Sequence, residues 1–206
     1  MDHSAITKVV LLVIAAIFFS GCTSPSSFSP SSVPVQSPGS LTTDTGFNHL
    51  LLSPEDLPQG LILVGDGAVQ ASDITDTMRK YGFQKGQYTL YGDTNHPDNK
   101  SRVLEQDIMI FNRANASAML DEYQTSLAAV KNKNSVTLPL PDPDLGEKSF
   151  AIKVSTEESS GIETSHYVFG FVQSGIFEVI SMDGTPDTYP ALVHVAERAA
   201  EKARQG

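Results

Sequence analysis

The chain has 206 residues, with 14 lysines and arginines against 24 aspartates and glutamates, which gives a formal net charge of −10 at pH 7. This acidic balance argues against a nucleic-acid partner, because the protein would repel the phosphates. Cys22 is the single cysteine, so an intramolecular disulfide and a thiolate metal site are both excluded.

The N-terminal segment starts weakly positive at Lys8 and continues with eleven apolar residues at positions 9–19. A helix of that length rises about 16 Å, whereas the hydrocarbon core of a bilayer is about 30 Å thick. The run therefore has the length of a signal-peptide core. The next residues are Ser20, Gly21 and Cys22.

The sequence Phe19-Ser20-Gly21-Cys22 resembles a lipobox, the processing signal of prokaryotic lipoproteins. The resemblance implies that residues 1–21 are a signal peptide and that Cys22 carries the lipid on its sulfur. It also implies a protein at the extracytoplasmic face of the cell membrane, with the bilayer as its partner. Phe19 departs from the pattern, in which an aliphatic residue is usual, and this bears on cleavage. An uncleaved N-terminal transmembrane anchor is the alternative.

The segment that follows is rich in serine, proline and threonine and has no charged residue between positions 23 and 43. Such a composition cannot bury enough apolar surface to fold. We therefore expect residues 22–44 to form a disordered tether and residues 45–206 to form a single domain, which is long enough for a sizeable core.

The first half of that domain predicts three strands and a helix. Residues 61–64 form an apolar strand that ends in a turn at positions 65–67, and residues 72–81 form a short helix stopped by Gly82. Residues 87–91 and 103–111 read as strands. In the second of these, alternation places Gln106 with Leu104 and Ile108, and directs Glu105 and Asp107 to the other face.

The second half predicts two long helices and three strands. Asn112 caps a helix whose apolar stripe recurs at three- and four-residue steps, at Ala116, Leu120, Tyr123, Leu127 and Val130. A polar segment at 131–146 separates it from a strand around residues 150–154. Residues 167–172 and 176–181 flank a hairpin turn at Ser174-Gly175. A last helix starts at Thr188, with Leu192, Val193, Ala196, Ala199 and Ala203 inward.

This order predicts an α+β domain with an antiparallel sheet of about five to six strands and helices packed on one face. The element order, with Leu145-Gly146-Glu147-Lys148 opening a strand, looks like that of small envelope lipoproteins with a PsbP/Mog1-like or kinase-sensor-like domain. The resemblance implies a binding or accessory module rather than an enzyme.

Two polar patterns are candidate sites. Asp93, Asn95 and Asp98 lie within one short segment and offer the oxygen ligands that calcium requires, although the segment is explained better as a hairpin loop rich in turn-forming residues. Asn99 and Asn115 each begin an acceptor pattern for N-glycosylation. The sequence lacks a complete dinucleotide fingerprint, and we expect no cofactor.

Tyr167, Phe169 and Phe171, which alternate along one strand, are a candidate interaction surface. If helices cover one face of the sheet, these rings would form an exposed apolar patch, and such patches mark interfaces. The pattern favours instead the central hairpin of a sheet that is covered on both sides or curved around its own core.

Taken together, the sequence favours a non-enzymatic lipoprotein, a membrane-anchored module for binding, sensing or assembly that could contact another envelope protein. The alternatives are an envelope hydrolase with a carboxylate-based site and a structural spacer of the cell envelope.

Overall fold

The computed structural model describes residues 46–93, 103–129, 135–157, 163–184 and 188–205. By its contacts the chain separates into residues 1–43 and a compact unit, Asp44–Gly206. Within the described segments, no helix is both long and apolar enough to cross a bilayer.

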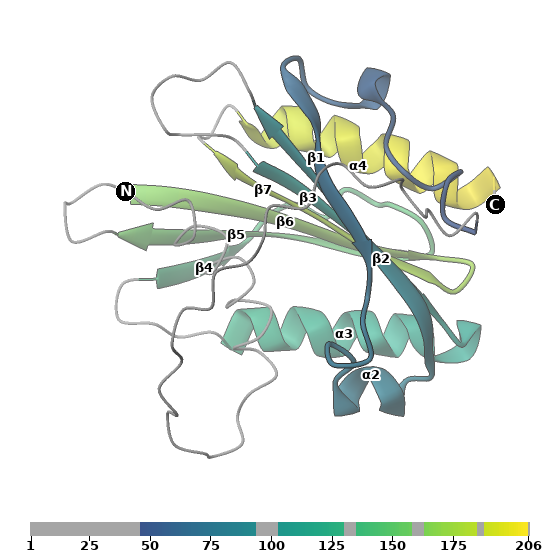
Figure 1. Ribbon diagram of the computed structural model, residues 1–206. Helices are drawn as coiled ribbons and strands as arrows, with labels where there is room; N and C mark the ends of the chain where they lie inside the picture. The colour runs from purple at the N-terminus through teal and green to yellow at the C-terminus, as the bar shows by residue number, and fades with distance from the viewer. Residues whose placement is uncertain (1–45, 94–102, 130–134, 158–162, 185–187, 206) are drawn as a thin grey trace, which may run out of the picture. The chain divides into compact units, whose positions relative to one another are not determined.

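The compact unit is an α+β fold built on one seven-stranded antiparallel sheet (Figure 1). The strands lie in the order β1-β2-β3-β7-β6-β5-β4, so β7 is at the centre, between β3 and β6. The strand bounds are β1 (Leu61–Ala68), β2 (Phe83–Asp93), β3 (Val103–Phe111), β4 (Ser135–Pro139), β5 (Lys148–Glu157), β6 (Glu163–Gln173) and β7 (Ile176–Gly184). The helices are the 3₁₀ turn η1 (Pro54–Asp56), α2 (Asp76–Lys80), α3 (Arg113–Ala129) and α4 (Thr188–Gln205).

The two long helices lie on opposite faces of the sheet, α4 on one and α3 on the other (Figure 1). The prediction that the helices pack on one face is therefore wrong. The reason lies in the central hairpin, where both faces are apolar. Phe169 and Ile180 belong to the core cluster that α4 completes, whereas Phe177 faces α3, with its ring 5.7 Å from that of Tyr123.

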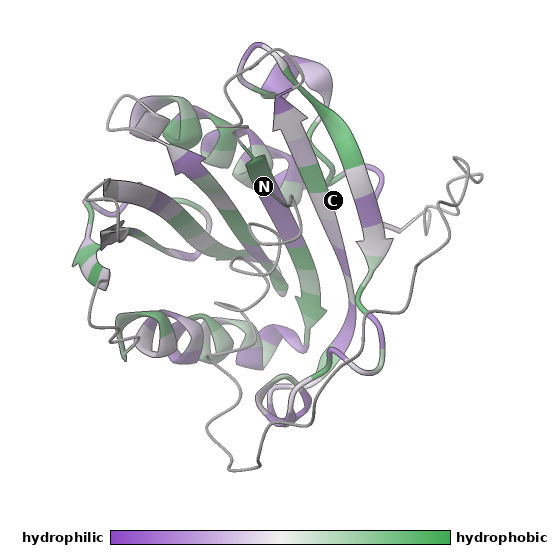
Figure 2. Ribbon diagram, turned by 60° about the vertical axis from the view of Figure 1, so that its left-hand side comes forward, coloured by the Kyte–Doolittle hydropathy of each residue, from purple (hydrophilic) through white to green (hydrophobic). Residues whose placement is uncertain are grey.

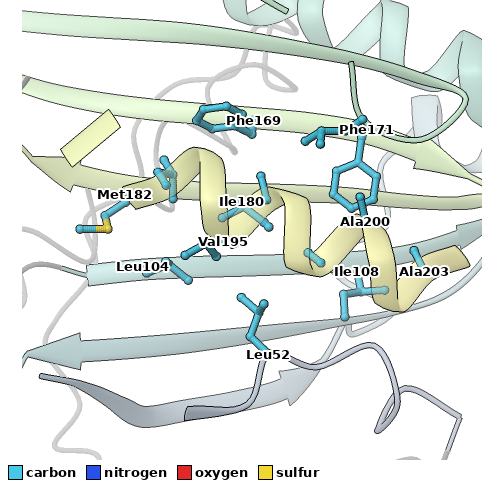
Figure 3. Close-up of a cluster of buried hydrophobic side chains, with 14 of the residues drawn as sticks. Leu52, Leu104, Ile108, Phe169, Phe171, Ile180, Met182, Val195, Ala200 and Ala203 are labelled. Atoms are coloured by element: carbon cyan, nitrogen blue, oxygen red, sulfur yellow. The ribbon is translucent and has the colours of Figure 1, made fainter. Parts of the chain in front are cut away.

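The core beneath α4 is the larger of the two layers (Figure 3). Side chains from three neighbouring strands point toward the small residues of α4, and Leu52 closes the layer from the segment before β1. The labelled members are Leu52, Leu104, Ile108, Phe169, Phe171, Ile180, Met182, Val195, Ala200 and Ala203. Alanines on the inner face of α4 allow the helix backbone to lie close to the sheet, which explains the alanine-rich end of the chain.

The sheet also has one strand more than the upper end of the prediction, because the polar segment 131–146 contains β4. Strand β4 pairs only with β5 and forms one edge of the sheet. The sequence of β4 lacks a clear strand pattern because of that position. An edge strand tolerates a proline such as Pro139, and it needs fewer apolar residues because less of it is buried.

Two local predictions in the first half are also corrected. The strand at residues 61–64 does not end in a turn at 65–67, because β1 continues to Ala68 with a register shift between Leu63 and Gly65. A Cβ on Gly67 would lie 2.7 Å from the hydroxyl oxygen of Tyr88, so a larger residue there would displace that ring. The helix predicted over 72–81 is shorter, and its cap is Thr75, whose hydroxyl accepts a hydrogen bond from the Met78 amide.

The hairpin and the final helix are confirmed. Ser174 and Gly175 take the positive φ values of 54° and 88° that a tight two-residue turn requires. Helix α4 begins at Thr188 and buries Leu192, Ala196, Ala199 and Ala203 as predicted, together with Val195 and Ala200.

Candidate functional site

Strand β3 carries two acidic residues to the face of the sheet that α3 packs on. Leu104, Gln106 and Ile108 face α4, so alternation directs Glu105 and Asp107 the other way, as the sequence predicts. Glu105 lies opposite Ser181 on β7, and Asp107 lies opposite Val179. Residues two apart on a strand are about 7 Å apart, so the two carboxyl groups are neighbours.

A histidine–aspartate pair lies beside them on the same face. Asp183 is two residues beyond Ser181 on β7, and His166 lies directly opposite it on β6. Nδ1 of His166 is 2.7 Å from Oδ1 of Asp183, which makes an ion pair when the imidazole is protonated. We call Glu105, Asp107, His166 and Asp183 the acidic cluster.

Glu105 is the most deeply buried member of the acidic cluster. The residue is only 7% exposed, and its Oε2 has no hydrogen-bond partner within the described part of the chain. Burial raises the pKa of its carboxyl above the usual range, His166 counteracts this, and the negative charge of Asp183 adds to it. Both neighbours therefore act electrostatically on the buried carboxyl.

Asp107 shares this environment. It is half-buried, and burial together with the charges of Glu105 and Glu178 raises the pKa of Asp107 well above its usual value. Burial and the same two carboxylates, Asp107 and Glu105, also raise the pKa of Tyr123 on α3. The acidic cluster thus concentrates negative charge in a region of low polarity, where a charged group without a partner is costly.

An apolar strip adjoins the acidic cluster on the same face, at the edge of the sheet. Ile62 and Val64 on β1 are 50% and 57% exposed, and Tyr88 on β2 lies opposite Asp107 and is partly exposed. Figure 2 shows the apolar start of β1 as the green stretch of the edge strand. We call Ile62, Val64 and Tyr88 the apolar strip.

The other face of the sheet holds a second polar group that has a structural role. The Gln106 amide donates to Oε1 of Glu178 at 2.6 Å and to the Leu50 carbonyl at 3.1 Å. Tyr91 donates to the Leu52 carbonyl. These bonds fix the segment before β1 against the sheet beneath α4. Burial raises the pKa of Glu178 to about 8, although the bond from Gln106 acts in the opposite direction.

The side chains of the acidic cluster can do two kinds of chemistry: they can bind a cation, or they can transfer a proton. In the described residues, no three histidine, cysteine, aspartate or glutamate side chains are grouped so that they could hold a metal ion. The unpartnered oxygen of Glu105 is an acceptor for a hydrogen-bond donor.

The residues singled out from the sequence lie elsewhere. Cys22, Asn95, Asp98 and Asn99 lie outside the described residues. Asp93 ends β2, half-buried and next to the first residue of β1. Asn115 is half-buried in the first turn of α3.

The aromatic interaction surface is corrected. Tyr167, Phe169 and Phe171 are 3%, 0% and 0% exposed, and they lie in the core beneath α4. The rings are covered because α4 occupies the face that the prediction left open. The alternative, a central hairpin covered on both sides, is the arrangement observed.

Sequence reasoning placed Glu105 and Asp107 on a shared face but did not name them as a site. The signal was available, since acidic residues alternate there with apolar ones in a strand that becomes central in the sheet. Their meeting with His166 and Asp183 depends on β3 pairing with β7, which joins residues some 75 positions apart and has no local signature.

Comparison with known proteins identifies a fold and no family. No family model matches the chain, and no curated protein matches it. Among solved structures, the chain is similar to the extracellular domain of PknH from Mycobacterium tuberculosis. The TM-score is 0.51 and the identity 10%, over 74% of this chain and 93% of that one. This similarity shows the fold and agrees in part with the resemblance to kinase-sensor-like domains.

Proposed function

We propose that the chain is a lipid-anchored, extracytoplasmic and non-enzymatic binding or sensing domain, and that the acidic cluster is its ligand site. The observation that carries the proposal is the Oε2 atom of Glu105, which is buried and without a hydrogen-bond partner in the described residues. Leaving such an acceptor unsatisfied is unfavourable, and a bound ligand relieves that cost.

The fold supports the same proposal. The similar structure is an extracellular domain, and a signal peptide with lipidation at Cys22 would hold this domain outside the membrane. Two acyl chains anchor a protein stably, whereas one chain gives marginal binding. The Ser/Pro-rich tether would separate the domain from the lipid headgroups.

Anchoring is tested by expressing the full chain and Cys22→Ser in a bacterial host that processes lipoproteins, with labelled palmitate in the medium. The wild type is expected to carry the label, to remain with the membrane and to be degraded by protease added outside the inner membrane. Cys22→Ser is expected to lose the label. A Cys22→Ser protein that stays in the membrane at precursor mass would support the uncleaved anchor instead.

Binding is tested by screening the purified full chain against a library of small molecules, with the melting temperature as the readout. A ligand of the acidic cluster raises the melting temperature of the wild type and not that of Glu105→Gln. Asp66→Asn is the matched control, because Asp66 lies on β1 opposite Thr89, on the other face of the sheet. Ligands that stabilise all three proteins equally would place the binding site elsewhere.

A second candidate is an envelope hydrolase that uses these carboxylates, and the raised pKa of Glu105 beside a histidine–aspartate pair favours it. A carboxyl with a raised pKa can act as a general acid. The two candidates differ in what becomes of the ligand. Mass spectrometry of the released ligand is expected to recover it unchanged, whereas turnover that Glu105→Gln abolishes would establish the hydrolase.

A further inference from the structure

Among the described residues, carboxyl groups outnumber basic groups around the acidic cluster. The ionisable groups that act on Glu105 are His166 and Asp183, and those that act on Asp107 are Glu105 and Glu178, so no lysine or arginine of the described residues is among them. The basic residues of α3 and β5 on this side pair elsewhere. Arg113 lies 3.3 Å from Glu147, and Lys148 lies 2.5 Å from Asp121.

The buried acceptor narrows the ligand class to one that donates hydrogen bonds. Oε2 of Glu105 lies in the acidic cluster without a partner in the described residues, and a second carboxylate, Asp107, is next to it on the strand. An ammonium group combines a full positive charge with three N–H donors, so it satisfies both needs at once. Charge-assisted bonds of this kind are about twice as strong as neutral ones.

A divalent metal ion fits less well than an organic cation. Calcium takes six to eight oxygen ligands from a cage, and the described residues contain no metal-holding group of even three such side chains. Glu105 and Asp107 lie two residues apart on one strand, so their carboxyl groups can contact a cation from one side but cannot surround it.

The apolar strip offers a contact surface for the non-polar part of the ligand. Ile62 and Val64 are 50% and 57% exposed, and they lie on the same face as the acidic cluster, separated from β3 by β2. Tyr88 lies between the two sets of residues, since it is opposite Asp107 on one side and Gly67 on the other. The ring of Tyr88 lies over Gly67 of β1 and so belongs to the apolar strip, where its face can attract a cation.

We propose that the acidic cluster binds the ammonium group of an organic amine whose apolar body lies on the apolar strip. The proposal rests on the function proposed above and names the ligand class of the same site. The ammonium donates to Glu105 and Asp107, and the hydrocarbon part covers Ile62, Val64 and Tyr88.

Isothermal titration of the full chain with 2-phenylethylamine tests this, with the neutral 2-phenylethanol and the anion phenylacetate as matched probes. The amine is expected to bind and the other two to bind at least about tenfold more weakly, which corresponds to one charge-assisted hydrogen bond. Calcium chloride is titrated separately and is expected to give no binding that Glu105→Gln removes.

Three variants locate the binding. Glu105→Gln is expected to weaken the amine about tenfold or more, and Asp66→Asn on the opposite face is expected to leave it unchanged. Val64→Ser changes an exposed residue and so preserves the fold. It is expected to weaken the amine by about threefold through lost apolar contact, which keeps the test decisive should Glu105→Gln fail to fold.

The failures of the two proposals are distinguishable. If the amine does not bind, or binds Glu105→Gln and Val64→Ser as tightly as the wild type, the amine proposal is overturned. If 2-phenylethanol or phenylacetate binds instead, and Glu105→Gln alters that binding, the acidic cluster is still the ligand site, but the proposal that it prefers a cation is overturned. The function proposed above fails separately, if the library screen finds no ligand sensitive to Glu105→Gln.

Discussion

Single acidic residues have opposite roles on the two faces of the central strands. Glu178 on β7 is fully buried beneath α4, and its Oε1 accepts a hydrogen bond from Gln106 while Oε2 has no partner in the described residues. A protonated carboxyl tolerates this environment better than a carboxylate does. Glu178 is thus a neutral group of the core, whereas Glu105 belongs to the acidic cluster.

The ionisation of Glu178 predicts how stability changes with pH. Its pKa is raised from 4.5 to about 8 in the folded protein. Between these values the folded state holds a proton that the unfolded state has lost, so the free energy of unfolding falls as pH rises from 4.5 to 8. Below pH 4.5 the contribution of Glu178 to the free energy of unfolding does not change with pH. Above pH 8 its carboxyl is ionised in both states, and the full cost of burying the charge lowers the stability.

The variant Glu178→Gln removes the ionisation and keeps the shape. The stability of the variant minus that of the wild type is expected to grow between pH 5 and pH 8, by about 1.4 kcal/mol for each pH unit at most. Urea unfolding at pH 5, 6.5 and 8 measures the difference. A difference that stays constant with pH would show that Glu178 is not protonated in the folded state.

At the scale of elements, the packing of α3 on the sheet depends on a glycine, which has no side chain. Gly170 on β6 faces α3, and a Cβ there would lie 2.7 Å from Cζ of Phe150 and 3.1 Å from Cδ1 of Leu120. Gly170→Ala is therefore expected to destabilise the protein by about 1–3 kcal/mol through overpacking.

Gly65→Ala is the control for that substitution. Gly65 is also a strand glycine, but the nearest atom to its Cβ position is Cδ1 of Leu90 at 3.9 Å, which is ordinary contact. Thermal unfolding of both variants checks the comparison. Equal losses at the two positions would attribute the effect to the backbone rather than to the contact with α3.

A buried ion pair joins η1 to α4. The Asp56 side chain is 1% exposed, and it accepts from Nε of Arg198 at 3.0 Å and lies 3.2 Å from Nζ of Lys202. Burial alone would raise the pKa of Asp56. Hydrogen bonds from Ser53, Arg198 and Lys202 outweigh that effect and hold the pKa well below its usual value of 3.8.

Asp56→Asn is expected to lower the free energy of unfolding by about 1–3 kcal/mol at pH 7. Because the folded pKa is depressed, the contribution is complete above about pH 5 and declines only as pH falls below the unfolded pKa of 3.8 toward the folded one. In urea unfolding, the difference between the wild type and the variant should therefore shrink between pH 5 and pH 3 but persist at pH 3. Glu201→Gln, which removes a partly exposed partner of Arg198, should cost less than about 1 kcal/mol.

The elements that the sequence predicted well have strong local signals. Asn112 accepts a hydrogen bond from the Ala114 amide at the start of α3, and the turn at Ser174-Gly175 needs positive φ values that glycine favours. What failed were properties set by distant partners. The residues around Ser135 have no sequence pattern that predicts an edge strand. In β6 both faces of the strand are apolar, but this pattern does not predict whether helices cover one face of the sheet or both. For the same reason, the shared face of Glu105 and Asp107 was predicted, but their position beside His166 and Asp183 was not.

At the scale of the compact unit, one sheet separates two helix layers that have few side chains in common. Leu120 on α3 and Leu192 on α4 are both almost fully buried, on opposite faces. Because β6 and β7 contribute side chains to both layers, we expect them to unfold together.

Leu120→Ala and Leu192→Ala are each expected to lower the free energy of unfolding by about 2–5 kcal/mol. Their effects should add, since the sheet lies between the two residues. Circular dichroism and tyrosine fluorescence are expected to report one coincident transition for each variant. Separate transitions for the two layers would disprove the shared core.

The ion pair at Asp56 has a mechanical consequence. A pull on the chain from residues before Gly46 reaches η1 before it reaches β1, because η1 comes first in the sequence. Strand β1 is an edge strand bonded on one side only, and a pull at its end would open its hydrogen bonds one after another. The contacts of Asp56 with Arg198 and Lys202 divert that load into α4, which is packed along its length against the core. Strand β1 is thereby expected to bear less of that tension.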